Sequence, residues 1–159
     1  MKIAIIGGGA SGMVCAFEAK HRDNEVLLFE QNELLGRKLR TTGNGRGNLA
    51  HENISPKNFH TTSPHILKAW LGQVNFQEIS AVLEMMGIVL TKERRGRYYP
   101  LSFEAKAVSE LMAESLKQKG VKCHLGQKVV RIEALDKGVR LFLAEGKSVV
   151  VDKVVIATG

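Results

Sequence analysis

The fold is decided by residues 7–12, which read Gly7-Gly8-Gly9-Ala10-Ser11-Gly12. Their spacing fits the pattern G-x-G-x-x-G, with its three glycines at Gly7, Gly9 and Gly12. In this pattern the first glycine allows a tight turn, the second lets a pyrophosphate approach the backbone, and the third lets a helix pack closely on a sheet. The N–H groups at the start of that helix favour phosphate groups. The motif therefore indicates a dinucleotide site, if a strand precedes it and a helix follows.

The flanking sequence meets both conditions. Lys2–Ile6 is a short apolar run rich in β-branched residues, which predicts a buried parallel strand. A helix is expected from Ser11 to about His21, and a second buried strand over Glu25–Glu30. Together these elements predict a βαβ unit.

The second predicted strand ends in an acidic residue, Glu30, which lies 18 residues after Gly12. A carboxylate about 20 residues beyond the glycines typically bonds the ribose hydroxyls of a dinucleotide. It would also repel a 2′-phosphate, so NADP is disfavoured as the ligand of this site. The alternative is an ordinary strand-to-helix turn followed by a solvated glutamate.

The composition is that of a soluble globular protein. The chain has 159 residues, of which 44% are apolar and 25% charged, and no apolar run approaches the roughly 20 residues of a membrane-spanning helix. The net charge of +7 favours anionic partners. Cys15 and Cys123 lie far apart, so we expect no disulfide, no zinc site and a cytoplasmic location. The scattered histidines have no metal-ligand spacing, so we expect no metal.

Downstream of the βαβ unit, residues 31–62 show little periodicity and are expected to form a long loop. Apolar spacing, helix caps and glycine turns then predict helices over 63–72, 75–87 and 104–119, a hairpin at 88–90 and 98–99, and strands over 121–125, 128–135, 139–143 and 148–156. The turns at 137–138 and 145–146 indicate a small antiparallel β-meander. The predicted fold class is α/β: a Rossmann-like parallel sheet with helices on both faces, plus this meander.

The sequence ends in Val154-Val155-Ile156-Ala157-Thr158-Gly159, an apolar strand followed by small and hydroxyl residues. Such a strand end allows a ligand to approach the edge of the sheet, although an ordinary strand end has the same composition. Because natural domains seldom end on a core strand, we expect residues 1–159 to be the N-terminal part of a dinucleotide-binding domain. A helix and hairpin insertion is expected at about 60–103 and the meander at about 128–151. A substrate domain and a segment that returns to the first sheet are expected beyond it.

A basic, glycine-rich segment at 36–48 reads GRKLRTTGNGRGN and contains four cations. Alternating glycine and polar residues can form nests of N–H groups that bind anions, and the cations would neutralise a pyrophosphate. The alternative for this segment is a solvated basic loop.

Together, these motifs resemble the N-terminal part of the BaiN-type, aminoacetone oxidase-like family of FAD-dependent oxidoreductases. The residues that carry the resemblance are GGGASG at 7–12, Glu30, GRKLRTTGNGRGN at 36–48, YPLS at 99–102 and VVIATG at 154–159. The resemblance covers essentially all 159 residues. It implies an enzyme that transfers electrons or hydride between FAD and a small organic substrate, with NAD(P)H as a candidate electron donor.

The resemblance also implies roles for particular residues. The glycine motif would hold the FAD pyrophosphate, Glu30 the adenosine ribose, and the main chain at Val129 the adenine. No catalytic residue is assigned. The predicted cofactor-binding residues are Gly7, Gly9, Ala10, Ser11, Gly12, Glu30, Arg37, Lys38, Gly43, Gly45, Arg46, Asn48, Val129, Thr158 and Gly159.

One departure from the family is Gly47, which stands where the glycine-rich loop commonly has a cysteine. Any role of that thiol is therefore absent, and the chain has no close cysteine pair for a thiol–disulfide relay. Electrons would pass directly between the flavin and the substrate.

A different class of function is a flavin-containing protein that binds or modifies RNA or tRNA through its basic surface. Tyr98 and Tyr99 lie beside Arg94, Arg95 and Arg97, and such aromatic rings stack on bases. An exposed basic hairpin whose tyrosines pack on the body explains the same residues. A nucleic acid partner is therefore disfavoured. A membrane partner is disfavoured because the sequence has no long apolar run. The oligomeric state is not predicted.

Overall fold

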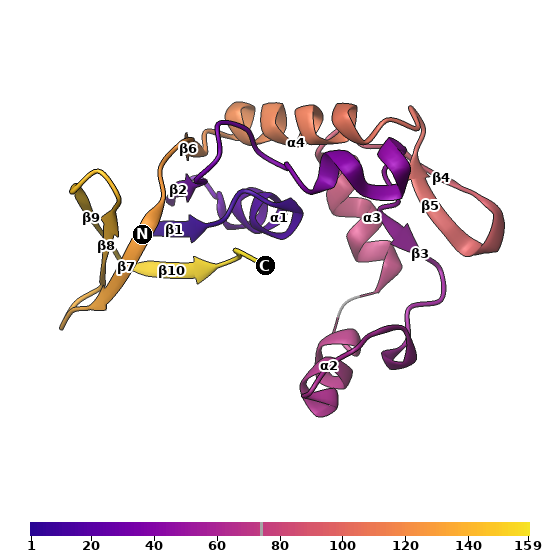
Figure 1. Ribbon diagram of the computed structural model, residues 1–159, viewed down its shortest axis with the longest axis horizontal. Helices are drawn as coiled ribbons and strands as arrows, with labels where there is room; N and C mark the ends of the chain where they lie inside the picture. The colour runs from indigo at the N-terminus through magenta and orange to yellow at the C-terminus, as the bar shows by residue number, and fades with distance from the viewer. Residues whose placement is uncertain (74) are drawn as a thin grey trace.

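A four-stranded parallel sheet forms the centre of the molecule in a computed structural model that describes residues 1–73 and 75–159 (Figure 1). In the order β10-β1-β2-β6, its strands are β10 (Lys153–Ile156), β1 (Lys2–Ile6), β2 (Glu25–Phe29) and β6 (Lys122–His124). The parallel register places Ile3 of β1 between Val26 of β2 and Lys153 of β10. The carboxyl ends of these three strands therefore lie at the same edge of the sheet.

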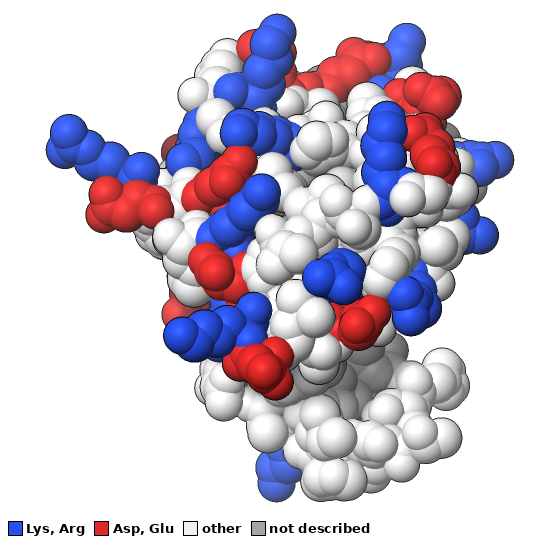
Figure 2. Space-filling view, turned by 90° about the vertical axis from the view of Figure 1, so that its left-hand side faces the viewer, with Lys and Arg blue, Asp and Glu red and all other residues white. Residues whose placement is uncertain are grey.

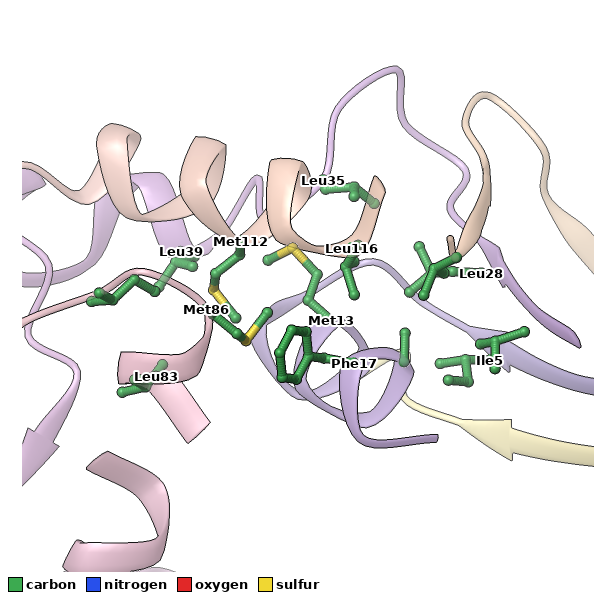
Figure 3. Close-up of a cluster of buried hydrophobic side chains, with 14 of the residues drawn as sticks. Ile5, Met13, Phe17, Leu28, Leu35, Leu39, Leu83, Met86, Met112 and Leu116 are labelled. Atoms are coloured by element: carbon green, nitrogen blue, oxygen red, sulfur yellow. The ribbon is translucent and has the colours of Figure 1, made fainter. Parts of the chain in front are cut away.

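Two helices, α1 (Ala10–Ala19) and α4 (Ala105–Lys119), pack on one face of this sheet. Their apolar side chains meet those of the strands in a core that also takes in the loop after β2 (Figure 3). Labelled members of this core are Ile5, Met13, Phe17, Leu28, Leu35, Leu39, Leu83, Met86, Met112 and Leu116. α4 ends at Gly120, whose left-handed backbone (φ 83°) supplies the helix terminus that the sequence predicted.

The other face of the sheet is covered by the antiparallel meander. Its strands, in the order β7-β8-β9, are β7 (Val129–Ala134), β8 (Val139–Leu143) and β9 (Ser148–Val151). Leu141, Leu143 and Val151 are buried against side chains of β1 and β2. The Rossmann-like α/β class with a meander is confirmed, but in the described residues the helices cover one face and the meander the other.

The strand expected over 148–156 is two strands, which is a correction to the sequence prediction. The strand is interrupted at Asp152. Its N–H donates to the Lys2 carbonyl (2.9 Å), and its Oδ2 accepts from the Lys2 N–H (2.6 Å). β9 therefore belongs to the meander and β10 to the parallel sheet. The change of sheet could not be predicted from the sequence, because valines precede and follow this position and indicate one continuous strand.

The region between the first βαβ unit and α4 carries the remaining elements. They are the short helices η1 (Leu39–Gly45), η2 (Pro56–Asn58) and η3 (Arg94–Gly96), the helices α2 (Pro64–Leu71) and α3 (Phe76–Met85), and the strands β3 (Ala50–His51), β4 (Leu90–Lys92) and β5 (Arg97–Pro100). The long loop expected over 31–62 thus contains three short elements. The hairpin is confirmed as β4 and β5, although its first strand lies at 90–92 and not at the expected 88–90. The strand β3 pairs with β5. The capping box of Asn75 and Glu78 is confirmed at the start of α3.

Candidate functional site

A pocket of about 420 Å³ lies where the carboxyl ends of β1, β2 and β10 meet. The register of the sheet brings Gly7, Glu30 and Thr158 to this edge from three distant parts of the sequence. Backbone hydrogen bonds fix the edge, because the Gly7 N–H donates to the Phe29 carbonyl (2.8 Å) and the Ala157 N–H to the Ile6 carbonyl (2.8 Å). The residues that line the pocket are Gly7, Gly8, Gly9, Glu30, Gln31, Asn32, Arg37, Lys38, Thr41, Ala157 and Thr158.

The glycines of the turn differ in the space around them. A Cβ at Gly7, where φ is 108°, would lie 2.5 Å from the Ala157 carbonyl oxygen, and a Cβ at Gly12 would collide with the Gly7 carbonyl oxygen. A Cβ at Gly9 would meet no atom within 4 Å. Gly7 and Gly12 are therefore required by the protein itself, whereas Gly9 leaves an open cradle beside the pocket.

Gly8, which the motif leaves unspecified, is also required by packing. A Cβ at Gly8 would lie 2.5 Å from Leu35 Cδ2 and 3.1 Å from Glu30 Oε2. Gly8 is not among the predicted cofactor-binding residues, although the run of three glycines is visible in the sequence. A glycine is needed at this position because the Leu35 side chain packs against it. No local sequence pattern predicts that contact.

Glu30 is buried, with 9% of its surface exposed, and its carboxylate joins the turn to the following loop. Oε2 accepts from the Gly8 N–H (2.7 Å), and Oε1 accepts from the Asn32 N–H (2.8 Å) and from Asn32 Nδ2 (2.5 Å). A carboxylate offers roughly four lone-pair sites, so capacity for a further donor remains. The carboxylate lines the pocket and is available to a hydroxyl group there.

Asn32 links Glu30 to the basic residues of the loop. Arg37 Nη1 donates to Asn32 Oδ1 (3.1 Å), while the amide of Asn32 donates to Glu30. Lys38 lies on the same wall, and its Nζ is 3.8 Å from the position of a Cβ at Gly159. The guanidinium and ammonium groups of Arg37 and Lys38 give this wall a positive charge that suits a diphosphate. Asn32 was missed by the sequence analysis, since an isolated loop asparagine carries no signal.

A second, smaller pocket of about 220 Å³ shares a wall with the first. Gly7, Glu30, Gln31 and Thr158 line both pockets. The smaller one continues to Val129 at the start of β7 and to the preceding residues Gln127 and Lys128. The two together form one groove that runs from the basic loop to the meander, and Val129 lies at its far end.

Four of the predicted residues belong to the glycine-rich loop and do not line this groove: Gly43, Gly45, Arg46 and Asn48. The Arg46 guanidinium lies over the rings of both Tyr99 (4.7 Å) and Phe103 (4.8 Å) and is 3.5 Å from the Glu93 carboxylate. These contacts fasten the loop to the β4–β5 hairpin. A cofactor role for the four residues stays a prediction.

The remaining predicted residues, Ala10, Ser11, Gly12 and Gly159, are not among the residues that line the groove. Ala10, Ser11 and Gly12 form the first turn of α1, whose N–H groups have no partners within the helix, and the helix N-cap Gly9 provides no side-chain cap. Those N–H groups and the positive end of the helix dipole favour an anion beside Gly9. Among the described residues, no group of three or more His, Cys, Asp or Glu side chains is arranged to hold a metal ion.

Comparisons with known proteins identify the family of the chain. The model of the family described as "HI0933-like protein Rossmann domain" matches residues 1–159. Among curated proteins, the chain is 37% identical to a 3-dehydro-bile acid delta(4,6)-reductase of Clostridium scindens, over 99% of this chain and 39% of the relative. It is 27% identical to a ribosomal RNA dihydrouridine synthase of Escherichia coli, over 98% of this chain and 38% of that protein. The chain thus spans about two fifths of the length of these relatives.

Solved structures show the same fold at low identity. The glycine oxidase of Geobacillus kaustophilus superimposes with a TM-score of 0.64 and 18% identity, over 99% of this chain and 55% of that one. In the part of the chain that the structure describes, no helix is both long and apolar enough to cross a membrane.

Proposed function

Because the chain belongs to the HI0933-like family of Rossmann-domain proteins, we propose that it is the FAD-binding part of an FAD-dependent oxidoreductase. The observation that carries the proposal is the groove at the carboxyl ends of β1, β2 and β10. It combines the open cradle at Gly9, a carboxylate at Glu30 and a basic wall at Arg37. These groups suit a dinucleotide, whose diphosphate would lie beside Gly9 and the basic wall and whose ribose hydroxyls would lie beside Glu30.

The residues present fit FAD in three respects. Gly9 leaves room for a diphosphate beside the N–H groups of α1, and Arg37 and Lys38 supply compensating charge. Glu30 would accept hydrogen bonds from ribose hydroxyls while it still holds Gly8. The main chain around Val129, at the far end of the groove, would contact the adenine.

Bound FAD would supply the hydride and electron chemistry, and the protein would bind and orient it. The names of the two curated relatives describe a reductase and a dihydrouridine synthase, so we propose that the protein reduces a substrate. We propose a small organic molecule as that substrate and NAD(P)H as the source of electrons. Since the relatives are longer, we also propose that a second domain supplies the substrate site.

The test is the visible absorption spectrum of the full-length protein. We expect the absorption of oxidised flavin and about one FAD released per chain on denaturation. Glu30→Ala should weaken FAD binding by about 1–3 kcal/mol, the cost of losing a hydrogen bond to a charged group. A colourless protein that takes up no FAD on reconstitution contradicts the proposal, and unchanged affinity in Glu30→Ala contradicts the role of the carboxylate.

A second candidate function is the modification of RNA, which one relative's name and one surface favour. Arg94, Arg95 and Arg97 lie at the tip of the β4–β5 hairpin with exposed side chains, and within the described ranges none of them forms an ion pair. The face that carries the meander differs, because acidic and basic side chains are interspersed there (Figure 2). Unpaired arginines are the groups that neutralise RNA phosphates.

Salt dependence separates this candidate from the first. If RNA binds the hairpin, replacing Arg94 and Arg95 together by alanine should weaken RNA binding and reduce its salt dependence. Arg22→Ala is the matched control, because Arg22 is an exposed arginine far along the chain in the turn after α1. Equal RNA affinity in the wild type and the double variant would show that the hairpin does not bind RNA. FAD binding should be the same as wild type in the double variant and in Arg22→Ala.

A further inference from the structure

Two polar side chains are buried in the described part of the molecule, and both hold the same segment. Glu30 is 9% exposed and Ser109 is fully buried. Glu30 lines the groove, whereas Ser109 lies on α4 among the apolar residues of the core and outside the groove. A buried hydroxyl is unfavourable unless it is hydrogen-bonded, so the partner of Ser109 indicates why it is there.

Ser109 Oγ donates to the Leu35 carbonyl over 2.9 Å, a contact between residues 74 positions apart in the sequence. The next residue, Gly36, donates its N–H to the Gly8 carbonyl (2.7 Å), and the Gly8 N–H donates to Glu30 (2.7 Å). The turn at Leu35 and Gly36 is therefore held between α4 on one side and the glycine motif on the other. Arg37 and Lys38 follow this turn directly.

Close packing on both sides restricts the conformation of the Leu35–Gly36 turn. Gly36 has a φ of 67°, and a Cβ there would lie 2.5 Å from Ser109 Oγ. The Leu35 side chain reaches the space beside Gly8 on the other side of the turn. Figure 3 shows Leu35 next to α4. The Leu35 side chain is buried and belongs to the core.

Packing alone does not account for a serine at this position. Alanine would fill the same place on a helix face between Val108 and Met112, bury no polar group and have a higher helix propensity. What the hydroxyl adds is the bond to the Leu35 carbonyl.

We propose that Ser109 is a positioning residue for the dinucleotide site: it fixes the Leu35–Gly36 turn and so holds Arg37 and Lys38 at the groove. This inference rests on the proposed function, since it assigns Ser109 to the same site. Ser109 itself does not line the groove.

The experiment compares two Ser→Ala substitutions on the same helix of the full-length protein. Ser109→Ala removes the bond to the Leu35 carbonyl, whereas Ser115→Ala removes a bond to the Met112 carbonyl (2.8 Å) within α4. We expect Ser109→Ala to weaken FAD binding to the apoprotein by about fivefold or more, the scale of one lost hydrogen bond, and Ser115→Ala to change it by less than about twofold. Ser109→Cys, which retains a weaker donor, should fall between them.

Hydrogen exchange of the apoprotein gives a readout that does not depend on FAD. Amides of residues 35–41 should exchange faster in Ser109→Ala, while those of β1 and β2 keep their wild-type rates. Wild-type FAD affinity in Ser109→Ala overturns the inference, whether or not exchange changes. If Ser109→Ala does not fold, Ser109→Cys decides in the same way. Failure of the proposed function is distinguishable, because the wild-type protein would then bind no FAD.

Discussion

Single residues of the glycine turn carry different tasks, although the motif presents them alike. Gly12 and Gly7 are confined by the backbone of the protein, and Gly8 by Leu35 and Glu30. Gly9 is surrounded by open space. The same substitution should therefore affect folding at one position and ligand binding at another.

Gly9→Ala should leave the stability of the apoprotein within about 0.5 kcal/mol of wild type, because the added methyl group meets no protein atom. It should weaken FAD binding at least about tenfold, since the methyl group would occupy the proposed place of the diphosphate. Urea unfolding of the apoprotein and FAD titration measure the two effects.

Gly12→Ala is the matched comparison. Its methyl group collides with the Gly7 carbonyl, so it should lower the free energy of unfolding by about 1–3 kcal/mol. If Gly9→Ala binds FAD as tightly as the wild type, the diphosphate does not lie beside Gly9.

Among the elements, those with local signals could be predicted from sequence. β1, β2, α1, α4 and the capped helix α3 all follow from apolar spacing, caps and glycine stops. The division of 148–156 at Asp152 could not be predicted, because the bonds to Lys2 that cause it join opposite ends of the chain. The residues of the site also differ in whether the sequence predicts them. Gly7, Gly9 and Glu30 follow from the glycine motif and its spacing. Asn32 and Ser109 depend on tertiary contacts.

The edge strand β6 carries a titratable group whose charge state is coupled to folding. Burial, together with Lys122 and Lys2, lowers the pKa of His124, whose ring stacks on Phe29 at 4.8 Å. The folded protein therefore holds this proton less tightly than the unfolded chain. The resulting stability is present above the unfolded pKa of about 6.5 and is lost as the pH falls toward the folded value.

His124→Phe should reduce this loss, because phenylalanine keeps the aromatic contact and does not titrate. The measurement is the free energy of unfolding from urea titrations between about pH 7.5 and pH 5, where the wild type should lose more stability than the variant. His65→Phe, at an exposed position on α2, is the control. Parallel pH profiles for wild type and His124→Phe would show that this histidine does not contribute.

At the scale of the whole molecule, one sheet separates two apolar cores. α1 and α4 close one core, and the meander closes the other through Leu141, Leu143 and Val151. The groove lies at the edge that both cores share, between the basic loop and the start of the meander. Loss of either core should therefore affect the site.

Leu141→Ala tests whether the meander is part of the folding unit. Leu141 is fully buried, so the substitution should lower the free energy of unfolding by about 2–5 kcal/mol in a single transition. Val150→Ala, at a position on β9 that is 47% exposed, should cost less than about 1 kcal/mol. A separate early transition in Leu141→Ala, seen by fluorescence and circular dichroism at different urea concentrations, would indicate that the meander unfolds alone.

The parallel arrangement of β1 also matters for how the protein is handled. Met1 lies at the amino end of β1, where its ammonium group donates to the Asp23 carbonyl (3.2 Å), and the groove lies at the opposite, carboxyl end of the same strand. An affinity tag or fluorescent label fused before Met1 would therefore emerge at the end of β1 opposite the groove. Such a fusion is the suitable form of the protein for immobilised binding measurements.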